Sequence, residues 1–300
     1  MTIPHGTIMG GLSTVPDLAQ GIAAYRDVLK LDLVEEGRLD PALAVSWGCP
    51  ANADASYAVL RPASRAPCWF RLVEQPAHPD FRPTTTYGWA AFETTVEDVW
   101  HWPEALPEDL FTIVGPPKTI ANMKPAFIPM QALGPGREMV YLNQVLDDMP
   151  DTDLPRAHAP VDRIFIVVLA TPDREASVAW YAERLGLARG VDYTFPYSMI
   201  NNAFGQPPET QTTITMVTHG RMPIVEVDDY PAAATPRARH PGMLPPGNAL
   251  VSLAVHDLDA CRADWIAPPA AREGALYEGR RAATAIAAGG ELVECIEVGG

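Results

Sequence analysis

Residues 16–31 of the chain read PDLAQGIAAYRDVLKL, and residues 172–187 read PDREASVAWYAERLGL. Aligned without a gap, six of the sixteen positions are identical, from Pro16 and Pro172 at one end to Leu31 and Leu187 at the other. The offset of 156 residues is about half of the 300-residue chain. An internal repeat constrains the architecture more strongly than any local signal. The sequence therefore predicts two related halves.

The first copy has the periodicity of a helix. Leu18, Ile22, Tyr25 and Leu29 follow each other at spacings of four, three and four residues, which places them on one face of an amphipathic helix. Asp17 stands just before this face, where an aspartate side chain caps the first turn. We expect a helix after Asp17 and an equivalent helix in the second copy.

Strand-like runs surround each helix in the order β-α-β-β-β. In the first half we expect strands at 7–15, 32–38, 57–61, 69–74, 89–96, 112–115, 127–132 and 138–145, with a second helix at 97–111. In the second half we expect strands at 163–171, 212–217, 223–228, 249–255, 280–286 and 291–298, with a helix at 257–265. This pattern gives two βαβββ modules in each half, four in all.

The segment 147–160 is acidic, rich in proline and poor in apolar residues, which is typical of a linker. We predict an N-terminal domain of two modules at 1–148, a linker at 149–160 and a C-terminal domain of two modules at 161–300.

The composition excludes several classes of partner. The net charge is −15, with 22 basic against 37 acidic residues, whereas a nucleic-acid partner requires clustered Lys and Arg. No apolar run is long enough to span a bilayer, and the first residues lack the regions of a signal peptide. The four cysteines form no CxxC pair, which favours a reducing compartment. We expect a cytoplasmic protein with neither a nucleic-acid nor a membrane partner.

The repeated segments resemble the V-x-D…F-Y…L-G-L signature of the vicinal oxygen chelate superfamily, also called the glyoxalase/bleomycin-resistance/extradiol dioxygenase superfamily. The matching residues are Asp17, Tyr25 and Leu29–Leu31 in the first copy, and Asp173, Trp180–Tyr181 and Leu185–Leu187 in the second. The phrases FTIVGPP at 111–117 and LAVHDL at 253–258 are also similar to the family. This resemblance implies an α+β fold in which four βαβββ modules pair into two open β-cups, one cup per domain.

The resemblance also implies a divalent metal bound by His or Glu from the first and last strands of the modules. Carried over to this chain, the first-strand positions hold Gly10, Ala91, Ile166 and Leu250, and the last-strand positions hold Arg71, Tyr141, Glu226 and Glu294. Only the two glutamates are metal ligands by chemistry, and none of the seven histidines falls on a first strand. We therefore expect no metal cofactor, and keep a metal-bound form as the alternative.

The last-strand residues are the candidate catalytic groups. Two facing carboxylates in the C-terminal cup, Glu226 and Glu294, supply a general base and a general acid, because their proximity raises one pKa. Arg71 and Tyr141 in the N-terminal cup are able to stabilise a developing oxyanion.

Residues 190–209 are expected to form a long loop, which in a compact domain is often a binding loop. Its aromatic and amide side chains suit a flat organic ligand. The predicted substrate-binding residues are Tyr193, Phe195, Tyr197, Asn201 and Asn202.

These features favour a metal-independent lyase or isomerase that acts on a small aromatic or carbonyl compound by proton abstraction and elimination. Two alternatives stay open: a metal-dependent ring-cleaving dioxygenase or glyoxalase-type enzyme, and a non-catalytic protein that sequesters a small molecule. The expected partner is a small-molecule substrate, and we allow for a homodimer.

Overall fold

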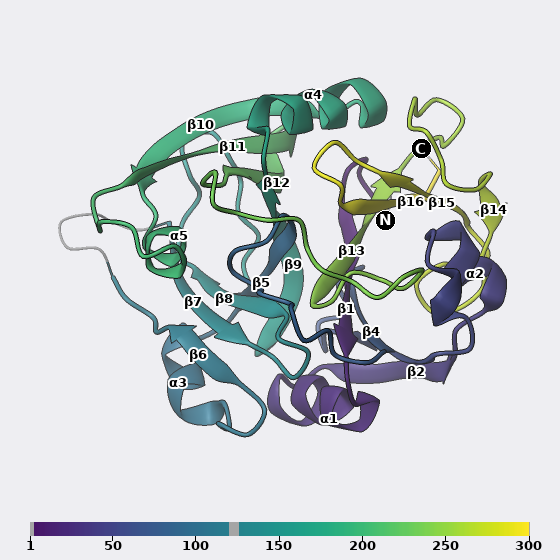
Figure 1. Cartoon of the computed structure of the whole chain (residues 1–300), viewed down its shortest axis with the longest axis horizontal. Coiled ribbons are helices and arrows are strands. Elements are labelled where there is room, and N and C mark those ends of the chain that lie inside the picture. The colour runs from purple at the N-terminus through teal and green to yellow at the C-terminus, as the bar shows by residue number, and fades with distance from the viewer. Residues whose placement is uncertain (1–2, 120–125, 300) are drawn as a thin grey trace.

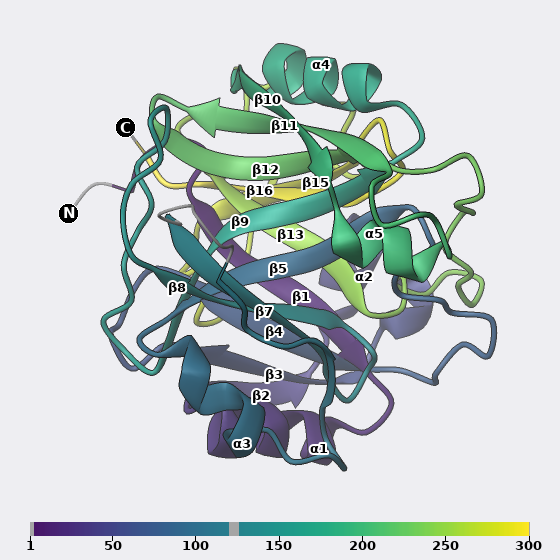
Figure 2. The ribbon, with the colours of Figure 1, turned by 90° about the vertical axis from the view of Figure 1, so that its left-hand side faces the viewer.

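The chain folds into two eight-stranded sheets in the computed structural model, which describes residues 3–119 and 126–299 (Figures 1 and 2). One sheet has the strand order β14-β15-β16-β13-β1-β4-β3-β2 and is called cup one here. The other has the order β10-β11-β12-β9-β5-β8-β7-β6 and is called cup two. The α+β class and the two-cup architecture predicted from the sequence are confirmed.

The first half of the chain supplies modules one and two. Module one consists of β1 (Ile8–Val15), α1 (Leu18–Ile22) with a π-helical extension (Ala23–Val28), β2 (Asp32–Arg38), α2 (Pro41–Ser46), a 3-10 turn (Pro50–Asn52), β3 (Ser56–Arg61) and β4 (Trp69–Glu74). Module two consists of β5 (Gly88–Val96), a 3-10 turn (Val99–His101), α3 (Trp102–Ala105), β6 (Thr112–Gly115), β7 (Phe127–Leu133) and β8 (Met139–Val145).

The second half supplies modules three and four. Module three consists of β9 (Val161–Thr171), α4 (Arg174–Leu185), β10 (Ala188–Pro196), α5 (Ser198–Ala203), β11 (Gln211–His219) and β12 (Met222–Asp229). Module four consists of β13 (Asn248–Val255), β14 (Ala270–Ala271), β15 (Arg281–Ile286) and β16 (Leu292–Glu297).

Aspartates start the helical segments as the repeat predicts. Asp17 Oδ1 accepts a hydrogen bond from Gln20 N at 3.0 Å, and Asp173 Oδ1 accepts one from Ala176 N at 2.9 Å. Asp98 does the same for Trp100 N at 3.0 Å in module two. Each cap satisfies a backbone donor that the first helical turn leaves unpaired. An aspartate cap thus starts the helical segment that follows the first strand in three of the modules.

Two predicted elements are wrong. Residues 257–265 form no helix, because their backbone groups bond elsewhere: Arg262 N donates to Arg184 O at the end of α4. Residues 190–209 are not a loop either, because β10 extends to Pro196 in pairing with β11 and α5 follows it. The alternation of Val191, Tyr193 and Phe195 is the period-two signal of that strand.

The pairing of the modules also differs from the prediction. Cup one combines module one with module four, and cup two combines module two with module three, so each cup takes one module from each half of the sequence. Within a module the first strand is left with one open edge, which must be paired. Strand β1 pairs antiparallel with β13, and β5 pairs antiparallel with β9. The expected pairing of consecutive modules would satisfy the same edges, so the repeat by itself does not select the partner.

The main hydrophobic core is shared by residues of both sheets. Gly11 of β1 lies so close to Phe92 of β5 that an added Cβ would come within 2.5 Å of the ring. Helix α2 and strand β14 mark cup one at one end of the molecule, whereas α5 lies over cup two toward the other end (Figure 1). The two cups therefore present separate sites.

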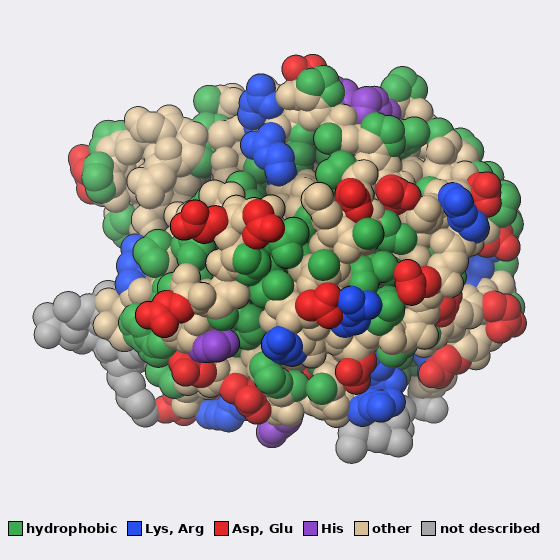
Figure 3. Space-filling model, turned by 90° about the horizontal axis from the view of Figure 1, so that it is seen from below, with side chains coloured by type: hydrophobic (Ala, Val, Ile, Leu, Met, Phe, Trp, Pro, Cys, Tyr) green, Lys and Arg blue, Asp and Glu red, His purple; other side chains and the backbone are tan. Residues whose placement is uncertain are grey.

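Among the residues that the structure describes, no helix combines the length and apolar character needed to cross a bilayer. On the face shown in Figure 3, Lys and Arg side chains are scattered among Asp and Glu side chains instead of gathering in a patch.

Candidate functional site

The predicted last-strand residues lie on the floors of the cups, each in register with one residue of a first strand. In cup one the register pairs are Leu12 with Arg71 and Ser252 with Glu294. In cup two they are Glu93 with Tyr141 and Val168 with Glu226. The four catalytic candidates are therefore brought together in a different combination from the one predicted: Arg71 joins Glu294, and Tyr141 lies in the same cup as Glu226.

The first-strand partners lie two residues beyond the positions carried over from the family pattern. Side chains two residues apart on a strand face the same side, so both positions of each pair point toward the same face of the sheet. The shift matters because it exchanges Ala91 for Glu93 and Leu250 for Ser252. The spacing alone could not reveal this shift: both sets of positions stand at a constant distance before Asp17, Asp98, Asp173 and Asp257, five residues for one set and seven for the other.

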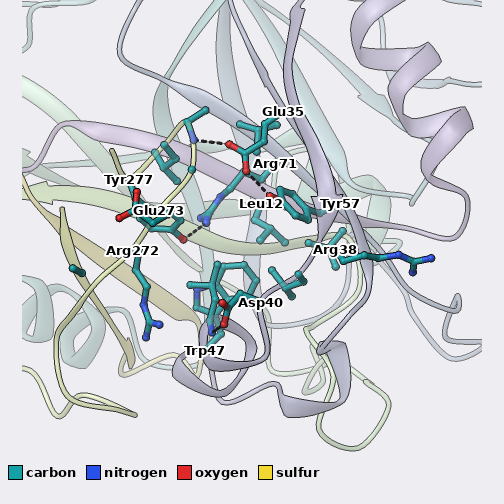
Figure 4. A pocket seen from close by; sticks show the side chains of 18 residues that line it. Leu12, Glu35, Arg38, Asp40, Trp47, Tyr57, Arg71, Arg272, Glu273 and Tyr277 are labelled. Atoms are coloured by element: carbon teal, nitrogen blue, oxygen red, sulfur yellow. Dashed lines mark hydrogen bonds between the residues drawn. The ribbon is translucent and has the colours of Figure 1, made fainter. Parts of the chain in front are cut away.

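Cup one holds an open cavity of about 320 Å³ (Figure 4). Strands β1, β2, β3 and β4, the helix α2 and the segment 271–277 supply its lining. Its apolar surface includes Leu12, Leu43, Trp47, Val59 and Val73, and its polar surface includes Glu35, Arg38, Asp40, Tyr57, Arg71, Arg272, Glu273 and Tyr277. An apolar, aromatic lining with a few converging polar groups is typical of a small-molecule site.

The carboxylate of Glu294 lies beneath this cavity in a closed hydrogen-bond network. Oε1 accepts hydrogen bonds from Trp47 Nε1 at 2.9 Å and from the Tyr277 hydroxyl at 2.7 Å. Oε2 accepts one from the Ser252 hydroxyl at 2.6 Å and lies 3.0 Å from Arg71 Nη2. Four donors occupy both oxygens, so Glu294 has no free lone pair directed at a ligand.

Arg71 connects that network to the cavity. Its Nη1 donates to the Tyr277 hydroxyl at 2.8 Å and its Nη2 to the Ser252 hydroxyl at 2.5 Å. The guanidinium stacks near the ring of Trp47, with 5.4 Å between Cζ and the ring centroid. Its Nε is buried and has no hydrogen-bond partner. The side chain is 5% exposed and belongs to the lining of the cavity, so the guanidinium brings a positive charge to the cavity floor.

Glu35 and Tyr57 form a second polar pair on the wall of the cavity (Figure 4). The Tyr57 hydroxyl donates to Glu35 Oε1, and Ala275 N donates to Oε2 at 2.5 Å. Burial, together with the hydrogen bond to Glu35, raises the pKa of Tyr57 to about 12, so this phenol stays protonated near neutral pH. The sequence analysis missed this pair because it considered only the last strands of the modules.

Cup two has a different floor, made of three buried carboxylates. Glu93, Glu226 and Asp228 are at most 8% exposed, and burial is the main cause that raises the pKa of each. For Glu226 the pKa rises to about 7. Asn143 Nδ2 donates to Glu93 Oε2 at 2.5 Å, and Glu226 and Asp228 are hydrogen-bonded to each other.

The predicted substrate-binding residues all belong to the segment beside cup two. Tyr197 is the most directly involved, because its hydroxyl lies 3.4 Å from Glu226 Oε1 and 3.5 Å from the Tyr141 hydroxyl. Tyr193 and Phe195 are half-buried on β10, and Asn202 is exposed. Asn201 is buried and donates to Pro208 O and Thr210 O, which fixes the fold of the segment itself. With α5 in place, the cavity in cup two is only about 10 Å³.

The residues at the register positions do not fit the metal that the family resemblance implies. In cup one the Arg71 guanidinium lies against Glu294, at the position where a cation would need a ligand. In cup two Val168 and Tyr141 replace two of the four ligand positions. Within 3–119 and 126–299, no group of three or more His, Cys, Asp or Glu side chains is arranged to hold a metal ion.

Known structures share this fold. Glyoxalase I from Zea mays aligns with a TM-score of 0.61 at 16% sequence identity, covering 97% of this chain and 92% of that chain. A putative dioxygenase from Bacillus subtilis aligns with a TM-score of 0.59 at 10% identity, covering 98% of this chain and 86% of that chain. The fold that the resemblance implies is thus confirmed. No family model and no curated protein matches the sequence.

Proposed function

We propose that cup one is the active site of a metal-independent lyase or isomerase that acts on a small, partly aromatic carbonyl or carboxylate compound. The observation that carries this proposal is the Arg71 guanidinium, which lines an open cavity of about 320 Å³ together with the carboxyl group of Glu35. A carbonyl or carboxylate oxygen of a ligand would be attracted to this guanidinium, while Trp47 and the aliphatic side chains would enclose its apolar part.

The general base in this proposal is Glu35 instead of Glu294. Glu294 is saturated by four donors, and its role is to hold Arg71 and Tyr277 in position. Glu35 lines the cavity and keeps lone pairs beyond the two that accept from Tyr57 and Ala275 N. A carboxylate on the wall and a guanidinium on the floor are the arrangement that proton transfer beside a carbonyl group requires.

The reaction follows from these two groups. Glu35 removes the proton from the carbon next to the carbonyl group, and the electron pair of that C–H bond moves onto the oxygen, where Arg71 stabilises the enolate. In an isomerisation, protonated Glu35 returns the proton to another carbon. In an elimination, the enolate expels a leaving group from the adjacent carbon, and the leaving group departs with its electron pair. Neither course needs an oxidant or a metal.

The proposal is tested by hydrogen–deuterium exchange in D₂O, using phenylacetone and phenylpyruvate as probes. We expect the protein to accelerate loss of the proton signal next to the carbonyl, and Glu35→Gln to abolish the acceleration while the probe still binds. The matched control is Glu36→Gln, on the same strand but exposed and outside the cavity lining. Binding without exchange would favour a sequestering protein, and the absence of binding to either probe would remove the support for cup one.

A cytoplasmic location and a homodimer stay predictions. A dioxygenase or glyoxalase-type reaction gains no support from the ligand positions, where Arg71 and Leu12 stand in cup one.

A further inference from the structure

Cup two contains three buried carboxyl groups that no basic side chain compensates. Among the described residues, no Lys, Arg or His forms an ion pair with Glu93, Glu226 or Asp228. The buried Arg237 is the cation near Tyr230, but its guanidinium donates to the carbonyl oxygens of Trp89, Pro246 and Asn248. Buried carboxylates are normally paired, because the desolvation of an isolated charge is expensive.

Two buried acceptor oxygens of cup two, on β8 and β12, lack donors. Asn143 is 0% exposed, and while its Nδ2 donates to Glu93, its Oδ1 has no partner. Asp228 is 1% exposed, lines the small cavity and leaves Oδ1 without a partner. Asn143 is not one of the acidic groups, so its unpaired oxygen is an independent sign that donors are missing. A ligand that supplies several N–H donors and a positive charge would satisfy both features.

Aromatic and sulfur-containing side chains surround this acidic floor. Tyr141, Tyr197 and Tyr230 line the small cavity together with Met139 and Met199. The electron-rich faces of aromatic rings attract organic cations, and thioethers adapt to apolar groups attached to such cations. The contacts of the Tyr197 hydroxyl with Tyr141 and Glu226, at 3.5 and 3.4 Å, are long for hydrogen bonds between oxygens.

We propose that cup two is a second binding site, specific for a small organic ammonium ion. Its ammonium group would donate to Asp228 and Glu226, and its carbon substituents would lie against the three tyrosines. A divalent metal ion is the competing cation, but it needs a set of oxygen or nitrogen ligands at close, regular distances, and the described residues offer no such group. This site is independent of the reaction proposed for cup one.

Entry to the site requires α5 to move. Tyr197, Met199 and Ile200 close the cavity to about 10 Å³, the space of roughly one water molecule. The segment is a helix of six residues between Pro196 and Gly205, and its first residue is capped by no side chain. Ile200 is buried, Met199 packs against buried residues of cup two, Lys118 Nζ lies 3.5 Å from Ser198 Oγ, and Asn201 binds the backbone at 208 and 210. A helix of only six residues held by these contacts is suited to open and reclose over a ligand.

The charge state of the floor gives this binding a defined pH dependence. Burial raises the pKa of Glu226 to about 7 and the pKa values of Glu93 and Asp228 above their usual range. The neighbouring Tyr141, Tyr197 and Tyr230 stay protonated, because burial raises their pKa values as well. A cation binds the ionised carboxylates, so binding would release protons and tighten as the pH rises from about 6 to about 8.

The test is isothermal titration calorimetry with benzylammonium and tetramethylammonium, and with benzyl alcohol as the neutral analogue of the first. We expect benzylammonium to bind at pH 8 at least about tenfold more tightly than benzyl alcohol, with proton release detected in buffers of different ionisation enthalpy. Asp228→Asn and Glu226→Gln should each weaken it by about tenfold or more. Glu183→Gln, an exposed position on α4, removes the same charge and should leave the affinity unchanged.

Removal of one charge from a repulsive cluster should not unfold the protein, and thermal melting of each variant checks this. Hydrogen exchange of the amides at 198–203 gives a second readout, because benzylammonium should change protection in α5 without affecting α4. Equal affinity for benzylammonium and benzyl alcohol, or full affinity in Asp228→Asn, would overturn the proposal. So would tight binding of Mn²⁺ to cup two together with no binding of either ammonium ion.

Discussion

Arg71 and Glu294 are the residues on which the floor of cup one depends. Their side chains are 5% and 1% exposed, and Nη2 lies 3.0 Å from Oε2. Removal of one partner from a buried pair leaves the other charge uncompensated, which costs more than replacement of both. We expect Arg71→Met to destabilise the protein by about 3–5 kcal/mol. The double variant Arg71→Met/Glu294→Gln should recover much of that loss.

Urea denaturation of the two single variants and the double variant measures this coupling. Additive losses in the double variant would contradict the account, because they would mean that Arg71 and Glu294 contribute independently. Arg71→Lys is the matched control for charge. It keeps the positive charge but loses the planar fork that bonds Tyr277 and Ser252 together, so an intermediate loss is expected.

The sequence predicted these two residues but not the residues that hydrogen-bond to them. Arg71, Tyr141, Glu226 and Glu294 follow from the position of the last strand in each repeat, and a repeat preserves such positions. The network is completed by Ser252 on β13, Trp47 directly after α2 and Tyr277 in the loop before β15. All three lie outside the repeated segments 16–31 and 172–187, so the repeat could not indicate them.

Strand β1 packs so closely against its parallel neighbour β4 that the size of its side chains is restricted. A Cβ at Gly10 would lie 2.3 Å from the carbonyl oxygen of Trp69 on the parallel strand β4, a backbone atom that cannot rotate away. A Cβ at Gly21 in α1 would meet only side-chain atoms of Leu72 and Val15, at 3.1 Å or more. We expect Gly10→Ala to cost about 1–3 kcal/mol. Gly21→Ala should be close to neutral, since alanine favours the helix.

Chemical denaturation of both alanine variants tests this contrast. Equal stability of the two variants would show that β1 can shift away from β4 without loss of stability.

The two element predictions that proved wrong share one cause. A helix at 257–265 and a loop at 190–209 were inferred from local pattern, but Arg262 N bonds to the end of α4 and β10 pairs with β11. Tertiary hydrogen bonds therefore determine the secondary structure of both segments.

At the scale of the whole molecule, the repeated tyrosines connect one cup to the other. The Tyr25 hydroxyl of module one donates to Glu138 Oε1 at 3.0 Å, just before β8 in cup two. The Tyr181 hydroxyl of module three donates to Glu291 Oε1 at 2.7 Å, just before β16 in cup one. The repeat therefore encodes the contact between the sheets as well as the helix that carries it, although the partner strands could not be known from sequence.

The Glu138 contact predicts how the stability of the molecule depends on pH. Burial raises the pKa of Glu138 from 4.5 to about 7, against hydrogen bonds from Tyr25 and Gly136 N that lower it. Folding therefore takes up a proton at this site between those two pH values, so its contribution to stability is present below about pH 4.5 and is lost as the pH rises through 7. In Glu138→Gln, the amide oxygen can accept from Gly136 N and the amide nitrogen can donate to Tyr25.

We expect this variant to match the natural protein at pH 5 and to lose less stability between pH 5 and pH 8, by on the order of 2–3 kcal/mol. Urea unfolding at the two pH values measures the difference, and the exposed Glu209→Gln, which should leave the pH dependence unaltered, is the control. If Glu138→Gln kept the full pH dependence, the buried carboxyl would not be protonated on folding. The tyrosine contact would then join the two sheets through an ionised glutamate.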